Sequence, residues 1–255
     1  MNTKLLSYVR RCVEDYDMIK PGDRIAVGVS GGKDSLMLLT ALARLREFYP
    51  VPFEVEAVTL DMGHADGRPG MDFSPVEAYC RTLGVPYTLK KSEIHHVIFD
   101  LRREKNPCSM CAKMRRGALH GVLQERGLEK IALGHHYDDA VETFFLSLIF
   151  EGRLSCFQPV TYLDRTGITQ IRPLLYCGEK LIRHTAQRLE LPVVENPCPA
   201  DGNTKRQEIK ELIYELQGRY PGLKARAFGA MQRLPLPEWG PREHRRRPLP
   251  EEMEE

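Results

Sequence analysis

No apolar run in this 255-residue sequence reaches the roughly 18 residues that a membrane-spanning helix needs. The N-terminus also has no signal-peptide core, since residues 1–7 lead directly to Arg10 and Arg11. Charge of one sign is not in excess either: 37 lysines and arginines stand against 35 acidic residues, and a net charge of +2 does not by itself indicate a nucleic-acid partner. We therefore predict a cytoplasmic protein with no membrane contact, whose partners depend on where its charges are placed.

Cysteine occurs in an odd number, seven, without an export signal, which argues against a framework of disulfide bonds. Metal binding or thiol chemistry is the better explanation for some of these thiols. Four of the seven have no neighbour at the spacing of metal ligands, and we interpret them as structural: Cys12, Cys80, Cys156 and Cys177. We interpret five isolated histidines in the same way: His64, His95, His96, His120 and His184.

Apolar runs of strand type alternate with segments of helical periodicity along most of the chain. Strands are predicted at 24–30, 53–60, 87–89, 130–133 and 169–171, and helices at 2–18, 33–48, 73–83, after Cys111, 138–150, 178–190 and 204–218. This alternation predicts an α/β fold, a doubly wound and mainly parallel sheet with helices on both faces. We expect one domain over 1–232 with a short helical C-terminal part, and a disordered tail rich in proline and charge over 233–255.

The segment Ser30-Gly31-Gly32-Lys33-Asp34-Ser35 stands where the first strand ends and a helix begins, at the edge where open α/β sheets bind ligands. Two glycines let backbone N–H groups approach an anion, and the helix N-terminus, the lysine and two hydroxyls add further attraction. It is not a Walker A loop, because Lys33 stands where that motif has its second glycine and Asp34 where Ser or Thr should follow the lysine. We predict a pyrophosphate-binding loop.

A second polar segment, Gly134-His135-His136-Tyr137-Asp138-Asp139, follows the strand at 130–133, so we expect it to face the first loop across one cleft. Asp138 and Asp139 admit two roles that can coexist: carboxylates that hold magnesium beside ATP phosphates, and caps of the helix that starts there. Asp61 and Met62, just past the second strand, are predicted to line the adenosine side of the site by the same geometry.

Cys108 and Cys111 have the spacing that lets one turn of chain present two thiols to one metal. The pair alone also fits a redox dithiol, half of a zinc site or a buried pair without a role. Cys198, in a turn between two prolines, adds a third thiol, and three thiols without a fourth suit an iron–sulfur cluster with one open iron. Six cations near the pair favour the thiolate form: Arg102, Arg103, Lys105, Lys113, Arg115 and Arg116.

The loop at 30–35 resembles the PP-loop of the ATP pyrophosphatases, which cleave ATP to AMP and pyrophosphate and hold the substrate as an adenylate. Together with the three cysteines, Arg115-Arg116-Gly117 and Ile171-Arg172-Pro173-Leu174, it makes the chain resemble the TtcA family of tRNA 2-thiocytidine synthetases over about residues 5–216. The cysteine segments that form flanking zinc fingers in the related 2-thiouridine enzymes are absent from this sequence. Their absence favours the TtcA family.

This resemblance implies an adenine nucleotide alpha hydrolase-like fold and an ATP-dependent tRNA sulfurtransferase. Such an enzyme adenylates the C2 oxygen of a cytidine in the anticodon loop and replaces it with sulfur. The resemblance further implies that Cys108, Cys111 and Cys198 hold a 4Fe-4S cluster whose remaining iron carries sulfide, and that Asp138 or Asp139 holds Mg2+. The implied partners are tRNA, a sulfur donor such as a cysteine desulfurase, and a second copy of the chain in a homodimer.

The resemblance also assigns roles to individual residues. ATP contacts are implied for Ser30, Gly31, Gly32, Lys33, Asp34, Ser35, Asp61, Met62, Gly134 and His135. Catalytic roles are implied for Lys33, Asp138, Asp139 and Arg115, and Arg115 with Arg116 would hold RNA phosphate or the adenylate. A persulfide on Cys108 or Cys111 is an alternative form of the transferred sulfur.

Other functions fit part of the sequence. A ligase that forms lysidine or an amide shares the phosphate loop but uses an amine nucleophile and needs no cysteine. Thiolation of a different tRNA base uses the same chemistry. A zinc- or RNA-binding module without catalysis would explain the cysteines but not the phosphate loop.

Overall fold

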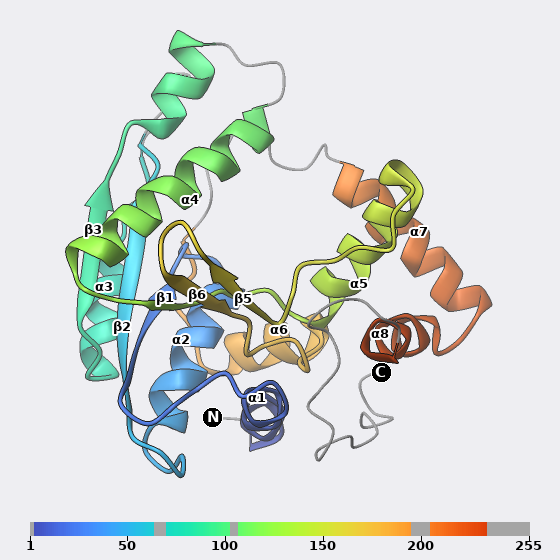
Figure 1. The fold of residues 1–255 in the computed structure, drawn as a ribbon, viewed down its shortest axis with the longest axis horizontal. Coiled ribbons are helices and arrows are strands. Elements are labelled where there is room, and N and C mark those ends of the chain that lie inside the picture. Colours follow the sequence, from blue (N-terminus) through green and yellow to red (C-terminus); the bar gives the residue numbers. More distant parts are fainter. Residues whose placement is uncertain (1–2, 64–69, 103–106, 195–204, 234–255) are drawn as a thin grey trace.

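The computed structural model of the chain describes residues 3–63, 70–102, 107–194 and 205–233. A six-stranded sheet runs through it in the order β3-β2-β1-β4-β6-β5, and every neighbouring pair is parallel except β5 with β6 (Figure 1). The strands are β1 (Asp23–Gly28), β2 (Phe53–Asp61), β3 (Tyr87–Lys91), β4 (Lys130–Ala132), β5 (Val160–Leu163) and β6 (Ile168–Ile171). The predicted mainly parallel α/β sheet is therefore confirmed.

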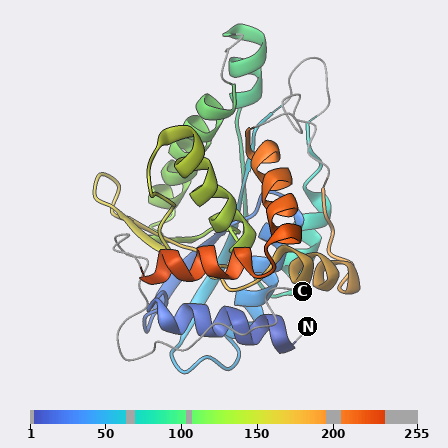
Figure 2. The same cartoon turned by 90° about the vertical axis from the view of Figure 1, so that its right-hand side faces the viewer.

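Helices cover both faces of the sheet. α1, α2, α3 and α6 contribute to the core on one face, and α4 packs on the other face against β2. α7 and α8 pack beside α5 on one flank, which faces the viewer in Figure 2. The helices are α1 (Thr3–Asp15), α2 (Lys33–Leu45), α3 (Ser74–Thr82), α4 (Pro107–Glu125), α5 (Tyr137–Leu146), α6 (Glu179–Arg188), α7 (Lys205–Arg219) and α8 (Leu223–Arg233), with π-helical turns η1 (His96–Leu101) and η2 (Ser147–Glu151).

β1 lies at the centre of the sheet because it is apolar on both faces. Ile25, Ala26 and Val27 are fully buried, as expected for a parallel strand covered by helices on both sides. The register pairs Val27 with Ala57 of β2 and with Ala132 of β4. β2 and β3 lie on one side of β1, whereas β4 and β6 lie on the other. This change of direction opens a crevice at the carboxyl ends of β1 and β4, where both predicted nucleotide segments begin.

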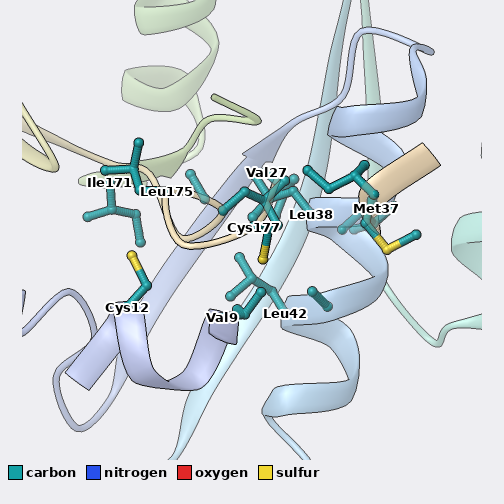
Figure 3. Packing of buried hydrophobic residues seen from close by; sticks show 14 of the residues in the cluster. Val9, Cys12, Val27, Met37, Leu38, Leu42, Ile171, Leu175 and Cys177 are labelled. Atoms are coloured by element: carbon teal, nitrogen blue, oxygen red, sulfur yellow. The ribbon is translucent and has the colours of Figure 1, made fainter. Parts of the chain in front are cut away.

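Cysteine contributes to the apolar core between α1, α2 and the sheet. Figure 3 shows Cys12 and Cys177 among aliphatic side chains such as Leu42, and both are fully buried. Burial raises the pKa of each of these thiols above its ordinary value, and it raises that of the buried Cys80 to about 11. Cys156 is partly buried, and burial raises its pKa to about 12. Thiols protonated at neutral pH are poor nucleophiles, in keeping with a structural role.

The start of α4 differs from the prediction. The helix begins at Pro107, so Cys108 and Cys111 lie in its first turn rather than in a loop ahead of it. Proline is favoured at the first helical position, because its missing N–H would have no intrahelical acceptor there and its fixed φ suits a helix. The helix that we predicted to follow Cys111 therefore begins four residues before it.

Three elements, η1, β5 and α8, have no counterpart in the prediction. β5 is a short antiparallel strand at the sheet edge, and its four residues are too few for an alternation of apolar and polar side chains to be recognised. α8 follows the turn at Pro221 and Gly222. α8 belongs to the core, since Phe228 and Met231 are fully buried. Cys198 and the tail at 234–255 lie outside the described residues. Within the described part of the chain, no helix is long and apolar enough to span a membrane.

Candidate active site

The loop between β1 and α2 is closed by its own serines. The Ser35 hydroxyl accepts the N–H of Ser30 (3.1 Å) and donates to the carbonyl oxygen of Gly32 (2.9 Å). The Ser30 hydroxyl lies 3.2 Å from that of Ser35, and Gly32 N–H donates to it at 3.4 Å. Gly32 is the N-cap of α2 and has no side chain to satisfy the first N–H groups of the helix. These donors are therefore available to an anion.

Glycine at position 31 is required by the backbone. Gly31 has φ +86°, a left-handed conformation that strains other residues. Its carbonyl oxygen accepts the N–H of Val194 (3.0 Å), and a Cβ at Gly31 would lie 3.1 Å from the Val194 Cβ. The loop is thus held against the segment that follows α6.

The second segment touches the first, as predicted from the carboxyl edge of the sheet. A Cβ on Gly134 would lie 3.1 Å from the backbone nitrogen of Ser35 and 3.2 Å from the carbonyl carbon of Asp34. Only glycine lets these two stretches of backbone come so close. The close approach makes one site of two segments that are about 100 residues apart in the sequence.

A cavity of about 500 Å³ opens beside this contact, between the carboxyl ends of the strands and α4. Such a volume is typical of a site for a nucleotide-sized ligand. Seven of the predicted site residues line it: Ser30, Asp34, Ser35, Arg115, Arg116, Gly134 and His135. The remaining predicted residues that the structure describes are not part of its lining: Gly31, Gly32, Lys33, Asp61, Met62, Cys111, Asp138 and Asp139.

Polar side chains that the sequence analysis did not select line the far end of the cavity. Arg172 donates to the Gln170 side-chain oxygen (3.3 Å), and the Gln170 amide lies 3.3 Å from His120 Nε2. Arg172 is buried against Phe157, which it contacts through a cation–π interaction at 5.0 Å, and its Nε has no hydrogen-bond partner. Burial lowers the pKa of Arg172 to about 10, so it remains a cation. Arg172 directly follows β6, so the carboxyl-edge rule could have identified it.

His135 is a neutral imidazole in the wall of the cavity. Burial, with the positive charge of Arg172, lowers its pKa to about 4. The ring packs on Phe157 with centroids 4.8 Å apart, and Nδ1 is buried without a hydrogen-bond partner. Asp34 Oδ1 in the same lining is also buried without one. Unpaired buried polar atoms are costly, and their presence here indicates that a polar ligand completes the site.

Lys33 is not part of the cavity lining, and its ammonium lies beside two carboxylates. Its ammonium lies 3.0 Å from Asp34 Oδ2 and 3.4 Å from Glu179 Oε1. Glu179 also binds Arg183 at 2.9 Å and Lys210 at 2.8 Å. Burial opposes ionisation of Glu179, but these cations outweigh it and lower its pKa to about 2. The sequence analysis missed Glu179 because two of its partners, Lys33 and Lys210, come from α2 and α7, and no local pattern signals them.

Asp138 and Asp139 are both engaged with the protein. Asp138 accepts the backbone N–H of Glu179 (2.7 Å) and the ammonium of Lys224 (2.7 Å). Burial alone would raise the pKa of Asp138, but Lys224 and the hydrogen bonds hold it below its ordinary value. The N-cap of α5 is His136, so the prediction that Asp138 or Asp139 is the N-cap is wrong; Asp139, three residues later, completes a capping box with His136. Magnesium binding by this pair stays a prediction, since the described residues contain no cluster of three metal ligands.

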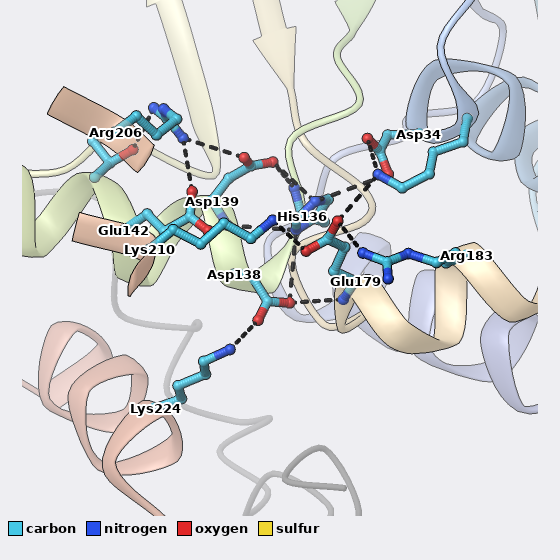
Figure 4. A network of polar contacts seen from close by, with 12 residues as sticks. Asp34, His136, Asp138, Asp139, Glu142, Glu179, Arg183, Arg206, Lys210 and Lys224 are labelled. Carbon is cyan, nitrogen blue, oxygen red and sulfur yellow. Dashed lines mark hydrogen bonds and ion pairs between the residues drawn. The ribbon is translucent and has the colours of Figure 1, made fainter. Parts of the chain in front are cut away.

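Arg206, the second residue of α7, binds the first turns of α5. Its guanidinium donates to Asp139 Oδ1 (3.2 Å), Glu142 Oε2 (3.4 Å) and Thr143 Oγ1 (3.2 Å). The contact brings the helix that follows the Cys198 segment against the Asp-Asp pair (Figure 4).

The thiol pair lies on the helix that walls the cavity. Cys108 and Cys111 are three residues apart in the first turn of α4, a spacing that places two residues on one helix face. Cys111 is half-buried and forms no disulfide. Ala112, Arg115 and Arg116, on the next turn, line the cavity. The helix that carries Cys111 thus forms part of the wall of the cavity that the phosphate loop also lines.

Comparison with known proteins agrees with this geometry. Residues 1–216 match the model of the ATP_bind_3 family, described as a PP-loop domain. The chain is 38% identical over 237 residues to a tRNA-cytidine(32) 2-sulfurtransferase of Pseudomonas putida (strain GB-1), covering 91% of this chain and 85% of that one. It is also 38% identical to the protein of the same name from Anaeromyxobacter dehalogenans (strain 2CP-C), covering 91% and 79%.

A solved structure shows the same fold with related chemistry. The U34-tRNA thiolase NcsA from Methanococcus maripaludis, solved with its 4Fe-4S cluster, superposes with a TM-score of 0.69 at 25% sequence identity, covering 87% of this chain and 75% of that one. Fold, motifs and sequence identity thus agree, and the chain belongs to the PP-loop domain family and, within it, to the family of the tRNA-cytidine(32) 2-sulfurtransferases.

Proposed function

We propose that this protein is an ATP-dependent tRNA sulfurtransferase that replaces the C2 oxygen of a cytidine in the anticodon loop with sulfur. One observation carries the proposal. A single cavity is lined by the phosphate loop, by Gly134 and His135, and by Arg115 and Arg116 of the helix that begins with Cys108 and Cys111. Its relatives named tRNA-cytidine(32) 2-sulfurtransferase and the U34-tRNA thiolase with its cluster support the same chemistry.

The phosphate loop would activate the oxygen. A pyrimidine C2 oxygen is a poor leaving group, and transfer of AMP from ATP to it, with loss of pyrophosphate, converts it into a good one. Backbone N–H groups at the start of α2 would stabilise the charge that develops on the phosphates. Lys33 would move from Asp34 and Glu179 to the phosphates, because in the absence of nucleotide those carboxylates are its partners.

Magnesium would be held mainly by the nucleotide. Mg2+ in such sites takes one or two carboxylates together with substrate phosphates and water, so no cluster of three protein ligands is needed. Asp34 has a buried carboxylate oxygen without a hydrogen-bond partner, whereas both carboxylates of the predicted pair already bind protein groups. We therefore infer that Asp34 shares the metal with Asp138 or Asp139.

The thiols fit an iron–sulfur cluster. Cys108 and Cys111 share one face at the N-terminal end of α4, where the helix dipole favours negatively charged thiolates. With Cys198 they would hold the 4Fe-4S cluster as three thiolate ligands, one fewer than the four that usually complete such a cluster. When bound, the cluster supplies the sulfur for transfer. The chain's own part is to keep the activated base beside it, and Arg115 and Arg116 would do so by holding RNA or adenylate phosphate.

Partners follow from the same reaction. tRNA is the substrate, and a donor such as a cysteine desulfurase would supply sulfur. We further propose that the chain works as a homodimer, which sedimentation of the purified protein would test.

The proposal is tested by purifying the protein without oxygen and incubating it with unmodified tRNA, ATP, Mg2+ and a sulfide source. We expect 2-thiocytidine by mass spectrometry of digested tRNA, with one AMP formed per thiolation. Cys111→Ala should lose iron and thiolation, whereas Cys80→Ala, a change in a buried thiol far from the cavity, should keep both. Full thiolation by a variant lacking Cys108, Cys111 and Cys198 would refute the role of the cluster. AMP formation that consumes an amine without sulfur incorporation would instead identify a ligase.

A further inference from the structure

A second cavity lies next to the phosphate loop, among helices that the reaction does not use. It measures about 530 Å³ and is formed by α1, α6, α7 and α8, with Asp138 of α5. Glu179 lines it and at the same time contacts Lys33 of the phosphate loop, so the cavity adjoins the nucleotide site. We call it the basic groove, and it is lined by Lys4, Tyr8, Asp138, Gly178, Glu179, Lys180, Leu181, Arg183, His184, Lys210, Tyr214, Gln217 and Lys224.

Positive charge exceeds negative charge in the basic groove. Five lysines and arginines face two carboxylates, Asp138 and Glu179. Both carboxylates are already neutralised, Asp138 by Lys224 and Glu179 by cations of α6 and α7. Lys180 has no ion-pair partner within the described part of the chain. Positive charge of this kind, gathered from four helices into a concave surface, attracts a polyanion.

Lys210 keeps its positive charge in the groove at neutral pH. Burial opposes the charge of Lys210, but Glu179 more than compensates and raises the pKa of Lys210 above its ordinary value. At the rim of the groove stands Tyr214, whose side chain is 83% exposed although it is aromatic. Exposed aromatic rings beside cations are typical of surfaces that bind single-stranded or looped RNA, where bases stack on the ring and phosphates pair with the cations.

We propose that the basic groove binds the phosphate backbone of the tRNA substrate beside the reactive cavity. The inference rests on the proposed function for the identity of the RNA, but the groove itself is defined by its charge and shape. ATP is the other polyanion of the reaction and thus the alternative ligand for the groove. The groups that suit the ATP phosphates, which are the backbone N–H donors at the start of α2 and the paired serines, lie at the phosphate loop. The groove is instead lined by long cationic side chains of four helices. Side chains of this kind suit a ligand that runs across several elements.

The groove would also couple the binding of RNA to the binding of ATP electrostatically. Glu179 divides its carboxylate between Lys33 on the nucleotide side and Lys210 and Arg183 on the groove side. An RNA phosphate that draws Lys210 toward it leaves more of the Glu179 charge to Lys33. The two sites are thus linked through one side chain.

The test measures equilibrium binding of a fluorescent anticodon stem-loop RNA and, separately, of ATP. Lys180→Glu removes the unpaired cation of the groove, and Lys91→Glu is the matched control, an exposed lysine at the end of β3 outside both cavities. We expect Lys180→Glu to weaken RNA binding about 10-fold and to reduce the slope of log Kd against log salt by about 1. ATP affinity should stay within twofold of the wild type, and Lys91→Glu should bind both ligands normally.

A second variant, Tyr214→Ala, distinguishes a loss of RNA binding from a loss of folding, since an exposed ring can be removed without disturbing the core. It should weaken RNA binding about 5-fold at every salt concentration, because stacking carries no charge. RNA affinity unchanged in both variants would refute the groove. Equal loss of ATP and RNA affinity in Lys180→Glu would assign the groove to the nucleotide. Because binding is measured without turnover, absence of 2-thiocytidine formation would count against the proposed function and leave the docking result intact.

Discussion

Gly134 sets the distance between the two halves of the active site. Its missing side chain allows the backbone after β4 to lie against Ser35 and Asp34 at the start of α2. α2 cannot yield, because ten of its 13 residues are buried. Any added atom at position 134 must therefore displace the second segment and with it His135, which lines the cavity.

Replacing this glycine should impair ATP binding more than folding. Gly134→Ala places a Cβ 3.1 Å from a backbone nitrogen, closer than real Cβ contacts usually come, and the buried α2 cannot move to relieve the contact. We expect the KM for ATP to rise about 10-fold, the loss of roughly 1.4 kcal/mol of binding, while the melting temperature falls only slightly. Gly121→Ala in α4, where an added Cβ meets no atom within 4 Å, is the control and should leave KM unchanged. An unchanged KM in Gly134→Ala would show that the second segment is free to move.

Residues that carry the site differ in how well the sequence reveals them. The glycines and serines of the phosphate loop could be predicted because their function requires a strand, a tight turn and a helix start, all of which are local patterns. Arg172 could also have been predicted, because it directly follows β6 at the carboxyl edge of the sheet. Glu179 and Arg206 could not be predicted, because the identity of a charged residue does not reveal its partner. Glu179 lies 146 positions after Lys33 in the chain and contacts it only because α6 packs against α2.

At the scale of elements, α5 joins the nucleotide site to the C-terminal helices. Its first turn binds the start of α6 through Asp138, α8 through the ion pair of Asp138 with Lys224, and α7 through Asp139 and Arg206. α8 itself could not be predicted, since its sequence lies between a Pro-Gly turn and a charged, proline-rich tail. Two of its side chains, Phe228 and Met231, are nevertheless fully buried.

The ion pair between α5 and α8 should contribute measurably to stability. Lys224→Met leaves the buried Asp138 carboxylate with one hydrogen bond fewer and without its ion-pair partner Lys224, and we expect the free energy of unfolding to fall by about 1–2 kcal/mol at pH 7 in urea titrations. Lys205→Met is the control: its pair with Glu208 is exposed, so the change should stay within about 0.5 kcal/mol.

The ion pair of Asp138 with Lys224 also determines how the stability difference between wild type and Lys224→Met depends on pH. Lys224 holds the pKa of Asp138 below its ordinary value in the folded protein, so the stability it contributes is present above the pKa of an unfolded aspartate and is lost as the pH falls through the folded value. The gap between wild type and Lys224→Met should therefore be widest near neutral pH and shrink below about pH 4. A gap that stays constant down to pH 3 would mean that lost packing of the lysine stem, rather than its charge, causes the effect.

Over the whole molecule, the sheet layer and the C-terminal helices are held by different forces. Ten of the 13 residues of α2 and the three central residues of β1 are buried, whereas α7 buries only Ile209 and Ile213 among its 15 residues. α7 is attached chiefly through polar contacts of Arg206 and Lys210 (Figure 4). Elements with few buried apolar contacts open at lower free energy than the core.

Amide hydrogen exchange should therefore show α7 opening before the sheet, and Arg206 should control how readily it does so. Arg206→Leu removes three hydrogen bonds to α5 without adding charge, and we expect exchange in α7 to become about 10-fold faster, a loss of roughly 1.4 kcal/mol, while amides of β1 and α2 keep their wild-type rates. Arg219→Leu, at the far end of the same helix, is the control and should change little. Faster exchange throughout the chain would instead show that α7 and the sheet unfold as one unit, because the arginine would then support the whole fold rather than one helix.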